Sequence, residues 1–123
     1  MNKLEKEFIP YGQALALKEL EFDEPCLGWY VSESYGLEYG KVVQSDLLGD
    51  AVIAPTFSQC FRWFIEKYNL HISICHSVNG KFDCWTNDGN LLENGKYCDF
   101  NTYEEAELAC LQKLIEIVKG GEQ

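Results

Sequence analysis

Residues 71–85 read HISICHSVNGKFDCW, with two histidines and two cysteines around Asn79-Gly80. The runs on both sides of Asn79-Gly80 include several residues that favour β-strands. Asn-Gly is a strong signal for a two-residue type I′ turn, because both central residues of that turn need a positive φ. The stretch therefore predicts a β-hairpin, and the rest of the chain has to supply the elements that cover it.

A two-residue turn predicts which residues of this hairpin face each other. Counting outward from Asn79-Gly80, Cys75 falls opposite Cys84 and His76 falls opposite Asp83. The cysteines then share the more polar face, while the histidine and the aspartate share the more apolar face that packs against helices. We therefore predict that Cys75 and Cys84 are neighbours, either as two reduced thiols in contact or as a redox-sensing disulfide.

The polar pair, His76 and Asp83, has the composition of the orienting pair in a catalytic triad. A nucleophile is missing beside it, because Cys75 and Ser77 point to the opposite face in this register. We therefore expect a partly buried, hydrogen-bonded histidine and no catalytic residue. The same geometry separates the candidate zinc ligands, and the chain has no C-x2-C pair, so we expect no metal and no cofactor.

Two helices are predicted in the first part of the chain from their start and stop signals. The first spans Pro10 to Leu20, because proline suits the first helical position. The second follows Thr56, which forms a capping box with Gln59, and it stops at Asn69. Four aromatic residues spaced four, three and four apart lie on one face of the second helix and are expected in the core: Phe57, Phe61, Phe64 and Tyr68.

The last helix is predicted over residues 103–118, where apolar residues recur at helical spacing. Thr102 and Glu105 form a second capping box at its start. Gly120 is expected to stop it, which leaves residues 119–123 as a frayed tail.

A further hairpin is predicted in residues 26–45, CLGWYVSESYGLEYGKVVQS. Its two ends are rich in strand formers, and Ser-Glu-Ser-Tyr-Gly in the middle has the composition of a turn. Residues 45–50, SDLLGD, are interpreted as a loop or a short helical turn. A short fifth strand is an option at residues 96–100.

The predicted order is therefore helix, hairpin, helix, hairpin with an optional fifth strand, helix. Short connections favour antiparallel pairing. The chain is expected to fold as an α+β protein with a single antiparallel sheet of four to five strands and three helices packed mainly on one face. Its length fits a single domain over residues 1–123.

The charge of the chain restricts its partners. There are 20 acidic and 10 basic residues, for a formal net charge of −10. A negative surface repels nucleic-acid backbones and anionic lipid, so we expect neither sequence-independent nucleic-acid binding nor membrane binding. The N-terminal residues, MNKLEKEFIPYG, contain no apolar signal-peptide region, so we expect a cytoplasmic protein with reduced thiols.

Three stretches, FIPYGQALALKELEFDEPC, QSDLLGDAVIAPTFSQCFRWFIEKYNL and TYEEAELACLQKLIEIVK, together resemble a family of small uncharacterised proteins encoded by gut bacteria, their prophages and phages. The resemblance covers both ends and the middle of the chain. The family has no assigned activity, so the resemblance assigns no catalytic residue to this chain. It does imply a mobile-element protein in the cytosol of a bacterial host, where such proteins often bind or inhibit host machinery.

Three classes of function are compatible with these observations. We favour a small acidic, non-catalytic module that binds a protein and inhibits or regulates it. Its binding residues are expected to be exposed tyrosines of the first hairpin, Tyr30, Tyr35 and Tyr39, because tyrosine is enriched at interfaces. The alternative is a structural or assembly component that forms a homo-oligomer, and a third class is a thiol-based or Cys/His enzyme that uses the residues of the second hairpin.

Overall fold

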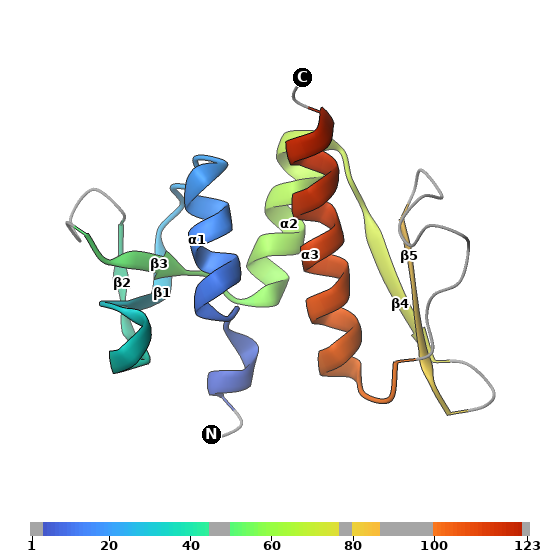
Figure 1. The fold of residues 1–123 in the computed structure, drawn as a ribbon, viewed down its shortest axis with the longest axis horizontal. Coiled ribbons are helices and arrows are strands. Elements are labelled where there is room, and N and C mark those ends of the chain that lie inside the picture. Colours follow the sequence, from blue (N-terminus) through green and yellow to red (C-terminus); the bar gives the residue numbers. More distant parts are fainter. Residues whose placement is uncertain (1–3, 45–49, 77–79, 87–99, 122–123) are drawn as a thin grey trace. The chain divides into compact units, whose positions relative to one another are not determined.

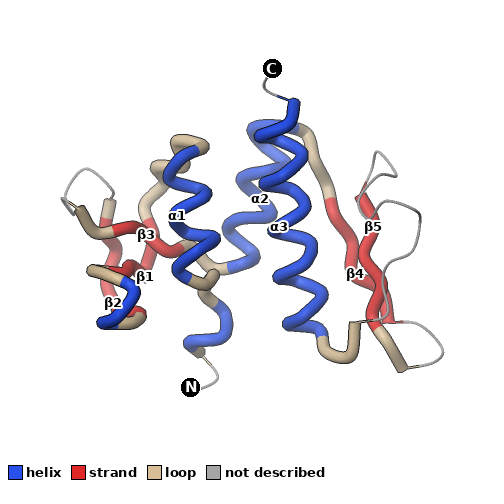
Figure 2. Tube along the Cα trace, in the orientation of Figure 1, coloured by secondary structure: helices blue, strands red, loops and turns tan. Residues whose placement is uncertain are grey.

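A computed structural model describes residues 4–44, 50–76, 80–86 and 100–121. The chain divides into two compact units, residues 1–59 and residues 60–123, and each is described by itself. Helices and antiparallel strands occur in both (Figures 1 and 2). The α+β class and the three predicted helices are confirmed. The expectation of a single domain stays a prediction.

The first unit begins with a 3₁₀ turn, η1 (Glu5–Glu7), and the helix α1 (Tyr11–Glu19), which confirms the helix predicted there. Pro10 caps α1 with an extended backbone. The helix ends at Glu19, and Glu21 adopts a left-handed conformation with φ 69°. The Phe22 N–H then donates to the carbonyl of Leu17 at 3.0 Å, and this arrangement closes the helix as a Schellman motif does.

A three-stranded antiparallel sheet follows, with the order β2-β1-β3. It consists of β1 (Cys26–Tyr30), β2 (Leu37–Val43) and β3 (Val52–Ala54), and the 3₁₀ turn η2 (Glu33–Tyr35) connects the first two strands. The predicted first hairpin is confirmed. The strand β3 was not predicted, because three residues are too few to show a repeating pattern.

The inner face of this sheet carries the core of the first unit. Gly28 lies under the ring of Phe8, which also packs against Tyr39 with ring centroids 5.6 Å apart. The Tyr30 hydroxyl donates to the Ile9 carbonyl at 2.9 Å, and its ring meets Tyr11 edge-on. The segment before α1 is therefore held against the middle of β1.

The helix α2 (Phe57–Tyr68) begins and ends as predicted. The Gln59 N–H donates to Thr56 Oγ1 at 3.2 Å, which is the first half of the capping box. The Gln59 side chain donates from Nε2 to the Pro25 carbonyl at 2.9 Å, which ties the start of α2 to the segment before β1. Asn69 ends the helix with φ 56°. In the aromatic stripe, Phe57 and Phe64 are buried while Phe61 and Tyr68 are half-buried.

The second unit contains the hairpin β4 (Ile72–His76) and β5 (Phe82–Thr86), which confirms the hairpin but corrects its register. Ile74 pairs with Cys84, and His76 pairs with Phe82. Five residues, 77–81, connect the paired residues His76 and Phe82. A two-residue turn followed by regular pairing leaves an even number of residues between any two paired residues, so it does not fit this connection. The turn residue Asn79 lies outside the described residues.

The helix α3 (Tyr103–Gly121) covers this hairpin and starts at the predicted capping box. The Glu105 N–H donates to Thr102 Oγ1 at 3.1 Å, which is the first half of the box. The Glu105 carboxylate accepts from the Asn101 N–H at 3.0 Å and not from the Thr102 N–H, so the second half is displaced by one residue. The helix continues past the stop expected at Gly120 and into the tail expected to fray. Phe100 forms a bridge with Phe82, so the end of the optional fifth strand pairs with β5, while residues 96–99 lie outside the described residues.

The predicted single sheet is not what the described strands form. They make two antiparallel sheets, one of three strands and one of two. The strand β3 occupies the second edge of β1, where the second hairpin could otherwise have paired, and β4 pairs with β5. The two hairpins therefore belong to separate sheets among the strands that are described.

Gly28→Ala tests the close approach of Phe8 to the sheet. A Cβ at Gly28 would lie 2.7 Å from the Phe8 ring and 3.0 Å from the Ala54 carbonyl oxygen. Because the ring is buried and cannot move away freely, we expect the substitution to lower the free energy of unfolding by about 1–3 kcal/mol in urea titrations.

Gly12→Ala is the matched control. Gly12 lies in α1, and a Cβ there would meet no atom within 4 Å. Alanine favours the helix over glycine, so this variant should gain about 0.5–1 kcal/mol. Equal effects of the two substitutions would contradict the packing described for Gly28.

Candidate functional site

The three tyrosines expected to form a binding surface do not share one. Tyr30 is 9% exposed, and strand alternation directs it to the inner face of the sheet. Tyr39 lies on the same face as the Gly28 position and is half-buried against Phe8. Only Tyr35, in η2, is open to solvent, at 76% exposed. The expectation that Tyr30 is exposed is therefore wrong.

The opposite, outer face of this sheet exposes apolar side chains instead. Leu27 is 50% exposed, Val31 is 52% exposed and Val42 is 65% exposed. Alternation along β1 places Leu27 on the same side as the half-buried Trp29, and the exposed Val31 directly follows the end of the strand. Val42 joins them because the next residue, Val43, is buried on the inner face opposite Cys26. We call these four residues, Leu27, Trp29, Val31 and Val42, the outer face.

A bulge in β2 brings Lys41 and Val42 to the outer face. The pairing of β1 with β2 shifts between Cys26 and Gly28, and Gly40 adopts φ 122° within this bulge. The Lys41 ammonium lies 5.8 Å from the centroid of the Trp29 ring, close enough for a cation–π contact. The bulge therefore brings one cation and one further apolar side chain to the outer face.

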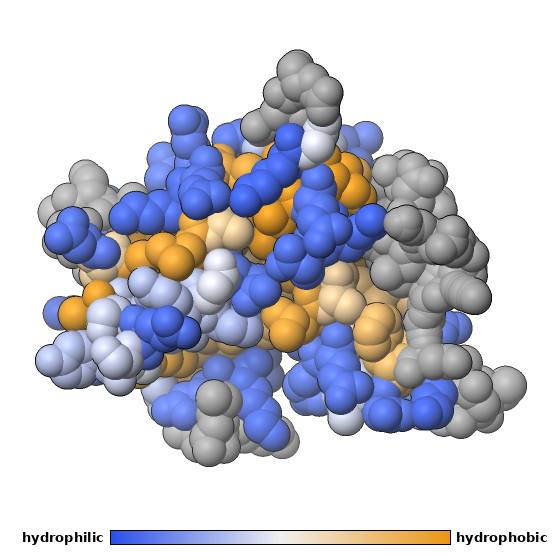
Figure 3. Space-filling view, viewed as in Figure 1, coloured by the Kyte–Doolittle hydropathy of each residue, from blue (hydrophilic) through white to orange (hydrophobic). Residues whose placement is uncertain are grey.

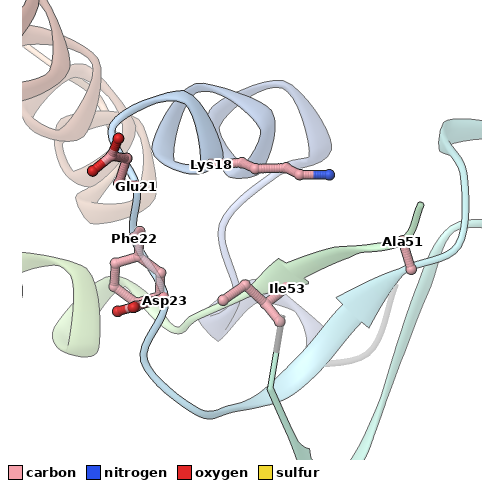
Figure 4. A pocket seen from close by; sticks show the side chains of 6 residues that line it. All are labelled: Lys18, Glu21, Phe22, Asp23, Ala51 and Ile53. Carbon is pink, nitrogen blue, oxygen red and sulfur yellow. The ribbon is translucent and has the colours of Figure 1, made fainter. Parts of the chain in front are cut away.

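A shallow pocket of about 250 Å³ adjoins this face at β3. Ile53 is the cross-strand partner of Trp29, so the two side chains lie on the same side of the sheet. Figure 4 shows Phe22 and Asp23 on the segment that follows α1 and Ile53 on β3, with Lys18 and Glu21 contributed by α1 and its end. The pocket thus combines apolar walls with two carboxylates and one ammonium.

The electrostatic character of the first unit is negative. Residues 1–59 contain ten acidic and four basic residues, for a formal charge of −6. Glu38 is exposed and pairs with Trp29 across the ladder, which puts a carboxylate beside the outer face. Hydrophobic surface shows between hydrophilic residues over this part of the chain in Figure 3. The outer face is therefore an apolar surface on an acidic unit.

The predicted neighbours Cys75 and Cys84 are separated by the observed register. Cys75 pairs with Asp83, while Cys84 pairs with Ile74. A shift of one residue moves every side chain of β5 to the other face, so Cys84 is buried at 2% exposure whereas Cys75 is exposed. The prediction that these two cysteines are cross-strand neighbours is wrong.

The predicted polar pair is separated for the same reason. His76 lies opposite Phe82, and their rings stack with centroids 4.8 Å apart. Asp83 lies on the other face of the hairpin, opposite Cys75. His76 is exposed and not partly buried as expected. The hairpin therefore does not bring a histidine and a carboxylate together as a catalytic pair.

Within the described ranges, no three histidine, cysteine or acidic side chains come together in a way that could hold a metal ion. No helix in the described part of the chain is both long enough and apolar enough to cross a membrane. Comparisons of the chain with models of protein families, with curated proteins and with solved structures find no match. The function has to be argued from the surface of the protein itself.

Sequence reasoning missed the outer face for a specific reason. In CLGWYV both alternating sets are apolar, namely Cys26, Gly28 and Tyr30 on one side and the outer-face residues on the other. Hydrophobic alternation therefore cannot tell which side is buried. The signal that could have helped is Gly28, because a glycine inside a strand often marks close approach of another group.

Burial perturbs the pKa of one cysteine at the start of the central strand β1. Desolvation raises the pKa of the Cys26 thiol to about 12 from its usual value near 9, and the Glu24 carboxylate adds to the increase. A hydrogen bond with the Gln59 side chain acts in the opposite direction. The Cys26 thiol donates to the Glu24 carbonyl at 3.3 Å. Cys26 is therefore a neutral packing residue at physiological pH.

The raised pKa of Cys26 predicts a loss of stability at alkaline pH. The unfolded thiol ionises near pH 9 and the folded thiol only near pH 12. The contribution of Cys26 to the free energy of unfolding is fully present below pH 9. Above pH 9 this contribution falls by about 1.4 kcal/mol per pH unit, because the unfolded state then binds fewer protons than the folded state. Cys26→Ala lacks this dependence, so its stability deficit relative to wild type should shrink in urea titrations as the pH rises. A deficit that stays constant from about pH 9 to about pH 11 would contradict the assignment.

Proposed function

We propose that this chain is a small acidic, non-catalytic protein-binding module that acts as an inhibitor or regulator. The outer face binds a basic segment of a partner protein that also carries large apolar side chains. The observation that carries the proposal is the exposure of Leu27, Val31 and Val42 around Trp29 on one side of a short sheet. Exposed apolar side chains that gather on one face commonly mark interaction sites.

The nature of the partner follows from charge complementarity. The unit that carries the outer face has a formal charge of −6, and exposed Glu38 lies beside Trp29. A positively charged segment would be attracted to this surface and a nucleic acid would be repelled. A second copy of the chain, with a net charge of −10, is also repelled at long range. A basic protein segment therefore suits the face better than self-association does.

The pocket at β3 suits one long basic side chain of the partner. An arginine or lysine of the partner can lay its aliphatic stem along Ile53 and Phe22 and direct its charge toward Asp23 and Glu21. Trp29 supplies the large rigid contact that dominates many interfaces. The resemblance to phage and prophage proteins motivates a bacterial cytoplasmic setting for this partner.

The proposal is tested by selecting ligands from a displayed library of random short peptides. We expect the enriched peptides to combine lysine or arginine with large apolar residues and to bind more weakly as salt increases. Leu27→Ser combined with Val42→Ser should weaken their binding at least about tenfold, since each buried aliphatic side chain contributes about 1.5–3 kcal/mol. Affinity is measured by fluorescence anisotropy.

A matched double variant serves as the control. Leu4→Ser combined with Leu15→Ser removes two exposed leucines of the same unit that are not part of the outer face, at 53% and 37% exposure. This variant should bind the selected peptides as tightly as wild type. Neutral or acidic peptides, or equal binding to both double variants, would refute the proposal. A dimer in light scattering that the outer-face variant converts to monomer would instead favour the assembly function.

A further inference from the structure

The buried neighbour of the Cys84 thiol is another cysteine, and it comes from α3. Cys84, Ala106 and Cys110 form one packed cluster with at most 2% of any residue exposed. Aromatic and aliphatic side chains surround this cluster, namely Phe61, Ile72, Ile74, Phe82 and Phe100. Two thiols therefore share one apolar compartment of the second unit.

Helix geometry brings the two sulfur atoms toward each other. Cys84 Sγ lies 3.5 Å from the Ala106 carbonyl oxygen, to which it donates. In an α-helix that carbonyl points along the axis toward the N–H of the residue four positions later, which is Cys110. The Cα–Cβ bond of Cys110 tilts back toward the N-terminus of the helix, and so toward the turn that holds Ala106. The Cys110 side chain thus extends toward the position of Cys84 Sγ.

We propose that Cys84 and Cys110 are a site of reversible disulfide formation that links β5 to α3. The exposed Cys75 lies on the other face of the hairpin and is not the partner of Cys84. The proposal is independent of the outer face, which belongs to the other unit. The redox-sensitive pair thus joins a strand residue, Cys84, to a helix residue, Cys110.

The electronic environment of Cys84 supports its role as the first nucleophile. A hydrogen bond from the side chain of Cys110 lowers the pKa of the Cys84 thiol, and this effect outweighs the opposite effects of burial and of Asp83. The thiolate is the form that attacks a disulfide. While the hairpin lies against α3, Cys84 therefore ionises more readily than it would without Cys110.

The reaction consumes one small disulfide, such as oxidised glutathione. The Cys84 thiolate attacks one of its sulfur atoms, the small S–S bond breaks, and one small thiol leaves. The Cys110 thiolate then attacks Cys84 Sγ in the mixed disulfide and releases the second small thiol. The two cysteines lose two electrons and two protons, and the small disulfide is reduced to two thiols.

Burial predicts how the rate of this reaction is controlled. Cys84 and Cys110 are almost inaccessible, at 2% and 0% exposure, so the oxidant reaches them only when the hairpin separates transiently from α3. A two-stranded hairpin has little stability of its own, which makes it the element that opens. Once formed, the bond closes a long loop of chain and restricts the unfolded state.

To test this proposal, the purified full chain is treated with excess oxidised glutathione, and the remaining thiols are then blocked with iodoacetamide. The disulfides are mapped by mass spectrometry. Cleavage after lysine and glutamate places Cys84, Cys98 and Cys110 on separate peptides. We expect the Cys84 peptide to be linked to the Cys110 peptide. Reduction with dithiothreitol should release both peptides, and the oxidised protein should unfold at a higher temperature than the reduced protein.

Two variants make the result decisive. Cys75→Ser should leave the Cys84–Cys110 link unchanged, whereas Cys110→Ala should abolish it and leave Cys84 as a glutathione adduct. If Cys110→Ala fails to fold, the map of the wild-type protein still identifies the partner of Cys84. Linkage of Cys84 to Cys75 or to Cys98, or alkylation of both Cys84 and Cys110 after full oxidation, would overturn the proposal.

Discussion

The pairing of Ile74 with Cys84 determines the side of the hairpin on which each residue of β5 lies. Side chains alternate along a strand, so this single pair sends Cys84 and Phe82 toward α3 together with Ile74. It also sends Asp83 to the other side, where it lies opposite Cys75. The apolar cluster beneath α3, the exposure of Cys75 and the contact between two thiols all depend on this register.

A comparable constraint organises the first unit. The ring of Phe8 reaches the backbone of β1 only because position 28 has no side chain, and a Cβ there would lie 2.7 Å from the ring. This contact anchors the segment before α1 on the inner face of the sheet, where the Tyr30 hydroxyl also binds the Ile9 carbonyl. With the inner face filled, the apolar residues on the other side of β1 remain at the surface.

The candidate site follows from these two arrangements and not from a reactive group. The hairpin that carries the histidines separates His76 from Asp83, and the thiol of Cys26 is neutral because its pKa is raised by burial. The outer face, by contrast, combines exposed aliphatic side chains with a tryptophan that Lys41 approaches to 5.8 Å. Recognition of a protein partner needs such a surface and requires no catalytic residue.

Local signals were sufficient for the elements that depend on neighbours in the chain. Thr56 and Thr102 cap their helices as predicted, Asn69 ends α2 in a left-handed conformation, and both hairpins form. These features rest on hydrogen bonds and backbone angles within a few residues, which the sequence encodes directly.

Features that depend on distant residues were decided by packing. The strand β3 is too short to be recognised without its partner β1, and the register of β4 with β5 depends on a connection whose length Asn79-Gly80 alone does not define. The two apolar sides of β1 look alike in the sequence, and Phe8 selects one of them. Cys110 is the neighbour of Cys84 because α3 packs on the hairpin. Local sequence patterns do not predict such a contact, since the two residues are far apart in the chain.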